Sequence, residues 1–147
     1  MTYEVPLTAS TTTCAFFTFS GSPVVGNPLT PSLVGSSTGA GISVSANDIQ
    51  LPRGEYILRF FAGITRTTGS KDNMQYQWRQ VGGALLGIDG STNRELFVGS
   101  RPASIDPADA HLEVGAGGAS VQVEVLAVGS TVAIDSTSCH AVVWRVS

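Results

Sequence analysis

The sequence predicts an all-β protein, an antiparallel β-sandwich or jelly roll folded as one domain of 147 residues. Three observations support this fold class. Short segments rich in Val, Ile, Phe, Tyr and Trp alternate between apolar and polar residues. Clusters of Gly, Pro, Ser and Thr interrupt these segments about every ten residues, at the spacing of turns. Hydrophobic residues make up 42% of the chain, which is enough to build a core.

The first third of the chain has the weakest strand pattern. Two short segments rich in β-formers, Tyr3–Leu7 and Cys14–Phe19, precede a Gly/Ser/Thr/Pro-rich stretch that ends at Ala46. Prolines in this stretch predict edge strands or a long loop rather than a central strand. We expect residues 1–147 to form a single domain, with residues 1–48 a partly extended segment that could attach to another protein or swap into a neighbouring chain.

The stretch "LPRGEYILRFFAGITR", residues 51–66, is the most apolar part of the chain. Its β-branched and aromatic residues, bounded by glycines, predict a strand rather than a helix. Successive side chains of a strand point to opposite faces. One face then carries Tyr56, Leu58, Phe60, Ala62 and Ile64, and the other carries Ile57, Arg59, Phe61, Gly63 and Thr65. Both faces are apolar apart from Arg59, which predicts that both are covered.

The segment "MQYQWRQV" repeats this design, with Met74, Tyr76 and Trp78 on one face and Gln and Arg on the other. We expect the intervening "TTGSKDN" to be a hairpin-style loop. Further along the chain, "SVQVEVLA" alternates cleanly and "HAVVWRVS" is rich in β-formers, so both are predicted strands.

Two segments of the second half predict other local structures. The Asp89-Gly90 pair in "ALLGIDGSTN" is typical of a turn. The segment "SIDPADAH", residues 104–111, is the one place that looks helical. Asp106 could cap a helix there and Pro107 suits its first turn, so we expect one helical turn.

Composition excludes several function classes. Lys and Arg together number eight, the net charge is −3 and no basic stripe is present, so we expect no nucleic-acid ligand. No apolar run approaches the length that spans a bilayer, and the N-terminal residues lack a signal-peptide pattern. We therefore expect synthesis in a reducing compartment. Cys14 and Cys139 are then more typical of two small buried hydrophobes than of a disulfide, although a bridge stays open.

Motifs for chemistry are weak. "GSSTG", residues 35–39, matches a nucleophile elbow around Ser37, but a Pro-rich loop precedes it and a β-like segment follows. "GAGGAS" at residues 115–120 leads into a strand and predicts a turn rather than a phosphate loop. His111 and His140 lack partners at metal-ligand spacing. We expect no catalytic residues, no cofactor and no bound metal.

The two-faced strands instead predict a subunit interface, because a chain of this size has little material left to cover both faces. The candidate interface residues are Ile57, Arg59, Phe61, Tyr76 and Trp78. The alternative is that loops of the same chain pack over these strands.

From residue 49 to residue 147, the chain resembles trimeric jelly rolls of the complement-component and tumour-necrosis-factor-like type. The resemblance rests on "IQLPRGEYILRFFAGI", "MQYQWRQVGGALLGIDGSTN", "SVQVEVLA" and "HAVVWRVS", and is greater to the versions found in bacteriophage decoration, head-spike and fibre proteins. It implies a homotrimer packed through the aromatic faces of these strands.

The function that this resemblance implies is structural. We expect a non-enzymatic trimeric decoration (cement) or head-spike protein on a phage capsid, assembled in the host cytoplasm and carried on the virion. Its partners would be its own copies and the major capsid protein or another virion protein. The alternative is a receptor- or carbohydrate-binding knob of a tail fibre or tip, with a host-surface glycan as ligand. We expect no membrane partner.

Overall fold

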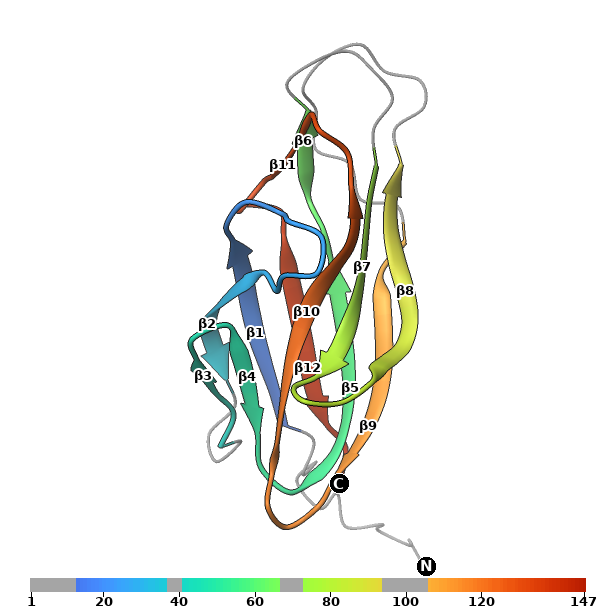
Figure 1. Cartoon of the computed structure of the whole chain (residues 1–147). Coiled ribbons are helices and arrows are strands. Elements are labelled where there is room, and N and C mark those ends of the chain that lie inside the picture. The colour runs from blue at the N-terminus through green and yellow to red at the C-terminus, as the bar shows by residue number, and fades with distance from the viewer. Residues whose placement is uncertain (1–12, 37–40, 67–72, 94–105) are drawn as a thin grey trace, which may run out of the picture.

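The computed structural model describes residues 13–36, 41–66, 73–93 and 106–147. Within these residues the chain consists of strands and turns without a helix, arranged in two facing layers (Figure 1). The first layer contains, in order, β2 (Thr30–Ser36), β1 (Thr13–Ser20), β12 (His140–Arg145), β5 (Gly54–Phe61) and β9 (Ala108–Val114). The second contains β8 (Leu85–Asn93), β7 (Asn73–Gln80), β10 (Ala119–Val128), β4 (Asp48–Leu51) and β3 (Ser43–Ser45). β6 (Ile64–Arg66) and β11 (Val132–Ile134) form a separate short sheet.

The strand pairs are antiparallel throughout the described residues. The two layers are joined along one side, where Ile88 of β8 pairs with Asp109 of β9. This architecture confirms the predicted all-β antiparallel sandwich. No helix of the described residues has the length and apolarity that crossing a bilayer requires.

The core lies between the two layers and is built from the predicted apolar faces. β5 contributes Tyr56, Leu58 and Phe60, β7 contributes Met74, Tyr76 and Trp78, and β10 contributes Val121, Val123 and Val125. Phe60 joins the layers, because its ring packs edge-on against Phe19 at 4.8 Å and against Tyr76 at 5.0 Å between centroids. Burial of these side chains is the main force that holds the sandwich together.

β5 and β7 lie in opposite layers, so they are not the two arms of a hairpin. β5 pairs with β12 and β9, whereas β7 pairs with β8 and β10. The expected hairpin between them is therefore wrong. Two strands that each present a wide apolar face bury more surface by facing one another than by lying side by side. Residues 67–72 of the connecting segment lie outside the described residues.

The helical turn expected in "SIDPADAH" is also wrong over its described part. Residues 108–114 form β9, which pairs along its length with β5. Ala108 and Ala110 are buried in the core beside Phe60 and Leu58 of the neighbouring β5. Pairing with a neighbouring strand outweighs the weak local preference of Asp and Pro for a helix start.

The Asp89-Gly90 pair lies within β8, so the predicted turn is wrong. The chain instead reverses at residues 81–84, where Gly82 has a φ of 74° and the Gly83 amide donates to the Gln80 carbonyl at 2.8 Å. Gly90 serves close packing, because it lies opposite Tyr76 and directly against that ring. Glycine in a strand often marks such a close approach.

The described part of the predicted N-terminal segment belongs to the sandwich. β1 pairs with β12 in the first layer, and its Phe17 and Phe19 are buried in the core. Residues 13–20 are therefore a core strand rather than an extended arm, because detaching this strand from the sandwich would expose both of its aromatic side chains to water. Attachment or exchange of residues 1–48 stays a prediction.

Cys14 and Cys139 lie near opposite ends of the same strand and are not joined to one another. Cys14 lies opposite Trp144 near one end of β12, whereas Cys139 immediately precedes the other end. Cys139 is buried, and its sulfur exchanges hydrogen bonds with the amide and carbonyl of Gly63 at 3.1 and 3.2 Å. This burial raises the pKa of the Cys139 thiol to about 11.

We expect Cys139 to resist alkylation by iodoacetamide at pH 8 in the native protein, because the thiolate is the reactive form and water is excluded from the site. Mass spectrometry after labelling, with and without guanidinium, measures the modification at each cysteine. Cys139 should react only in the unfolded chain. Complete native labelling of Cys139 on the timescale of a free thiol would contradict the buried environment described above.

Candidate subunit interface

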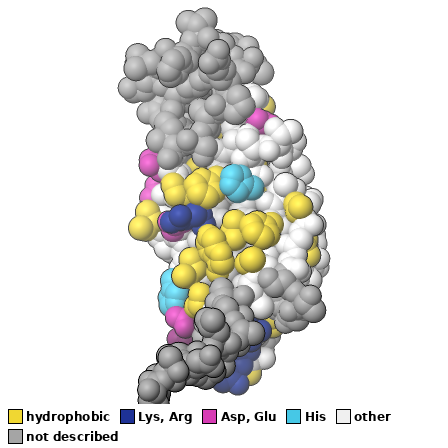
Figure 2. All heavy atoms as spheres, turned by 180° about the vertical axis from the view of Figure 1, so that it is seen from behind, with side chains coloured by type: hydrophobic (Ala, Val, Ile, Leu, Met, Phe, Trp, Pro, Cys, Tyr) yellow, Lys and Arg dark blue, Asp and Glu magenta, His cyan; other side chains and the backbone are white. Residues whose placement is uncertain are grey.

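The outer face of the first layer is formed by the side chains that alternate with the core residues. On β5, Tyr56, Leu58 and Phe60 point inward, so Ile57, Arg59 and Phe61 point outward. This places the three predicted interface residues of "LPRGEYILRFFAGITR" on one surface. Figure 2 shows that surface, on which hydrophobic side chains gather in the middle.

Strand register aligns the outward side chains of four strands into adjoining rows. The rows are Cys14–Trp144–Ile57–His111, then Phe16–Val142–Arg59–Asp109, then Thr18–His140–Phe61. Directly opposed residues in neighbouring strands lie about 5 Å apart, close enough for their side chains to touch. The rows therefore form one continuous surface, which we call the outer face.

The apolar part of the outer face is open to solvent in the single chain. Phe16 is 49% exposed and Ile57 is 42% exposed, and Trp144 and Val142 between them are partly buried. Ile88, which follows Asp109 at the side of the layer, is 69% exposed. Contiguous exposed apolar side chains of this kind mark surfaces that bind other proteins.

The charged groups of the outer face are paired with each other. Arg59 donates to both carboxylate oxygens of Asp109, at 2.7 Å each, and this two-fold hydrogen bonding raises the pKa of Arg59. Because the pair carries no net charge and its groups already satisfy one another, it can enter an interface at a smaller penalty than a lone ion.

Two histidines flank this pair. His140 stacks on Phe61, with ring centroids 5.0 Å apart, and the Arg59 guanidinium lies 6.0 Å from the centre of the same ring. His111 contacts Glu55 at 2.6 Å, and Ser147 also donates to Glu55. These hydrogen bonds, that of His111 foremost, hold the pKa of Glu55 below its ordinary value.

Solved structures share this architecture. Two crystal structures of murine APRIL, at pH 8.0 and pH 8.5, superpose with a TM-score of 0.56 at 6% and 9% identity, covering 91% of this chain and 98% of theirs. The globular domain of zebrafish complement 1qA protein has a TM-score of 0.50 at 13% identity, covering 90% and 93%. The fold is a jelly roll of this type. No family model and no curated protein matches the sequence.

Two of the predicted interface residues are not on the surface of this jelly roll. Tyr76 and Trp78 are fully buried in the core, where the Tyr76 hydroxyl donates to the Asp106 carbonyl at 2.7 Å and the Trp78 indole donates to the Ala108 carbonyl at 3.1 Å. Their assignment to an interface is wrong, because the first layer of the same chain covers the aromatic face of β7. Ile57, Arg59 and Phe61 stay interface predictions.

Sequence reasoning missed the outer-face residues on the other strands, namely Phe16, Val142, Trp144 and Ile88. The alternation in "HAVVWRVS" is a signal that separates Val142 and Trp144 from the inward Ala141 and Val143. Their place beside Ile57 depends on the β12–β5 register, which no local pattern contains.

The outer face of the second layer has a different character. Gln75, Gln77 and Arg79 of β7 lie there, as predicted, beside Gln122 and Glu124 of β10. Arg79 forms an ion pair with Glu124 across the two strands. A polar outer face is usual for a sandwich in water, so the apolar outer face of the first layer is the exception in this molecule.

The described sequence motifs that resemble catalytic or phosphate-binding sites have structural roles. Ser37 lies outside the described residues. In the segment "GAGGAS", residues 115–118 form the turn between β9 and β10, closed by the Gly118 amide donating to the Gly115 carbonyl at 3.0 Å, and the last two residues begin β10. In the part of the chain that the structure describes, no three His, Cys, Asp or Glu side chains are grouped to hold a metal ion.

Proposed function

We propose that this protein forms a homotrimer through the outer face of the first layer, and that the trimer is a structural, non-enzymatic component of a phage virion. The observation that carries the proposal is the apolar surface around Phe16 and Ile57, which surrounds the neutral Arg59–Asp109 pair. A second copy of the chain is the occupant that this surface favours.

Self-association is supported by the chemistry of the surface. Removal of Phe16, Ile57 and Ile88 from water favours association by about 25 cal/mol for each Å² of apolar area. The charged pair next to them needs no counter-ion from a partner, so an identical chain can cover it. Closure of the contact into a ring leaves no apolar surface at the ends, which favours a defined oligomer over a fibre.

We propose three protomers because the sequence resembles trimeric jelly rolls. The solved structures with the same fold support the jelly-roll part of this resemblance. The role on a virion follows from the likeness to phage decoration and head-spike proteins. In this proposal, the major capsid protein or another virion protein binds the trimer through a surface other than the outer face. Localisation to the virion is part of the same proposal.

Light scattering after size-exclusion chromatography tests the oligomer directly. We expect the purified chain at micromolar concentration to elute as one species with the mass of three protomers, because an apolar sheet face of this kind is too costly to leave in water. A monomer at that concentration would contradict the assembly. A stable dimer would retain the self-association but exclude the trimer.

Isothermal titration against phage capsids assembled without this protein tests the virion role. Saturable binding at a fixed number of trimers per capsid is the expected result, and empty capsids of an unrelated phage are the control. A trimer that binds neither capsids nor tail structures would overturn the virion role and leave the self-association in place.

A further inference from the structure

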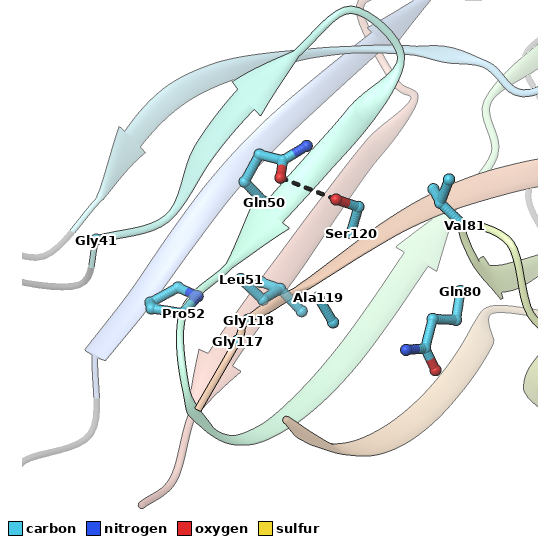
Figure 3. Close-up of a pocket in the computed structure, with 10 residues that line it drawn as sticks. All are labelled: Gly41, Gln50, Leu51, Pro52, Gln80, Val81, Gly117, Gly118, Ala119 and Ser120. Carbon is cyan, nitrogen blue, oxygen red and sulfur yellow. Dashed lines mark hydrogen bonds between the residues drawn. The ribbon is translucent and has the colours of Figure 1, made fainter. Parts of the chain in front are cut away.

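A hollow of about 540 Å³ lies away from the outer face, between β4, the end of β7 and the start of β10 (Figure 3). β10 lies beside β4 through residues 119–121 and beside β7 from residue 121 onward. The two neighbouring strands therefore approach β10 from either side near Ser120, and the turn before β10 adds the remaining wall. The volume is in the range of small-molecule sites.

The polar side chains that can meet a ligand here are Gln50 and Ser120. Ser120 donates to the side-chain oxygen of Gln50 at 2.8 Å, which fixes the Gln50 amide and leaves its NH₂ group for a ligand. The Ser120 hydroxyl oxygen can also accept a hydrogen bond, so a donor and an acceptor are both present. Gln80 lies opposite the core residue Val121, so its side chain points to the inner side of the layer, away from Gln50 (Figure 3).

The remaining wall is apolar or bare backbone. Val81, which is 43% exposed, and Pro52 supply apolar surface. Gly117 and Gly118 leave the backbone uncovered beside them: a side chain at Gly118 would be strained at its φ of 74° and would crowd the Leu51 carbonyl. A ligand can therefore lie directly against main-chain amides and carbonyls.

None of the ten residues that line the hollow is charged. A phosphate, carboxylate or ammonium group would lose its hydration here without gaining an opposite charge, which is unfavourable. A neutral ligand with many hydroxyl groups suits the Gln50 amide and the Ser120 hydroxyl, because each ligand hydroxyl both donates and accepts, and its C–H surface suits Pro52 and Val81. We propose that this hollow binds a neutral saccharide unit.

The affinity expected is weak. No aromatic ring is among the lining residues, so the stacking that strengthens many sugar sites is missing. We expect a Kd on the order of 1 mM for one sugar unit, with higher apparent affinity for a multivalent glycan bound by an oligomer. The site shares no residue with the outer face, so saccharide binding does not depend on the proposed assembly.

Nuclear magnetic resonance of the full ¹⁵N-labelled chain tests this site. The probes are methyl glycosides of glucose, galactose and N-acetylglucosamine, each titrated to tens of millimolar. For at least one glycoside, we expect saturable shifts of the side-chain amide signals of Gln50 and of the Gly118 backbone amide. Gln50→Leu should weaken that binding at least about fivefold, because a neutral ligand loses its hydrogen bonds to the amide. Gln75→Leu, a glutamine of β7 outside the hollow, should leave it unchanged.

Three outcomes would overturn the site. The first is that none of the three glycosides gives saturable shifts, and the second is that glycerol gives shifts of the same size. The third is that Gln75→Leu weakens glycoside binding as much as the variant in the hollow does. Preferential binding of sialic acid would contradict the neutral ligand class. Light scattering on the same samples separates the two proposals, because a monomer that binds a glycoside would refute the trimer and retain the saccharide site.

Discussion

Phe16→Asp is expected to dissociate the trimer and to leave the protomer folded. Phe16 is 49% exposed on the outer face, and the residues opposite it on the neighbouring strands, Val142 and Gly35, are uncharged. In the protomer, the new carboxylate stays in water, so the free energy of unfolding should fall by no more than about 1 kcal/mol. In the assembly, the carboxylate would be buried without a partner, which weakens association by about 3 kcal/mol, or roughly a hundredfold.

Light scattering over a dilution series measures the dissociation, and circular dichroism measures the fold. Val25→Asp is the matched control, since Val25 is an equally apolar side chain, 57% exposed, in the connection between β1 and β2. It should leave the trimer intact. Ile57→Asp is a weaker probe, because His111 lies opposite and can pair with the carboxylate. A Phe16→Asp protein that remains trimeric at the lowest concentration would place the interface elsewhere.

Gly90→Ala is expected to lower the free energy of unfolding by about 3 kcal/mol. An added methyl group at Gly90 would lie 2.2 Å from the Tyr76 ring and 2.7 Å from the main chain at Asp106 and Ala108. Tyr76 cannot easily move aside, because its hydroxyl donates a hydrogen bond to the Asp106 carbonyl and its ring packs against Phe60. To make room for the methyl group, β8 would have to move away from the main chain at Asp106 and Ala108.

Denaturant unfolding at a fixed protomer concentration measures this loss, and the midpoint of thermal unfolding should fall by roughly 10 °C. Gly83→Ala is the control, because a methyl group there meets its nearest neighbour at 3.5 Å, an ordinary contact, in the turn between β7 and β8. Its effect should stay within about 1 kcal/mol. Similar losses for both variants would mean that Gly90 acts through chain flexibility rather than close packing.

The alternation of side chains along individual strands could be predicted from the sequence. Tyr56, Leu58 and Phe60 separate from Ile57 and Arg59 because two-residue periodicity is a property of the local backbone. The same holds for Met74, Tyr76 and Trp78 on β7. The all-β class followed from these patterns together with the frequency of turn residues.

What covers each face could not be predicted in the same way. The sequence shows that Tyr76 and Trp78 share an apolar face but contains no local signal that the first layer, rather than another protomer, covers it. The Asp89-Gly90 pair predicted a turn because Asp-Gly is common in turns. In the structure, Gly90 instead lies in a strand, where the lack of a side chain leaves room for the Tyr76 ring. Contacts between residues far apart in the chain decide both cases.

The sequence by itself therefore determined the fold class and the two faces of each main strand, since both depend on neighbours in the chain. Only the tertiary structure decided that Phe16, Val142 and Ile57 adjoin on one surface, because strand register brings together residues separated by more than 80 positions. The same applies to the hollow beside Gln50 and Gln80, whose walls come from separate strands. Function in this protein is proposed from those surfaces, and hydrophobic burial between distant strands is what creates them.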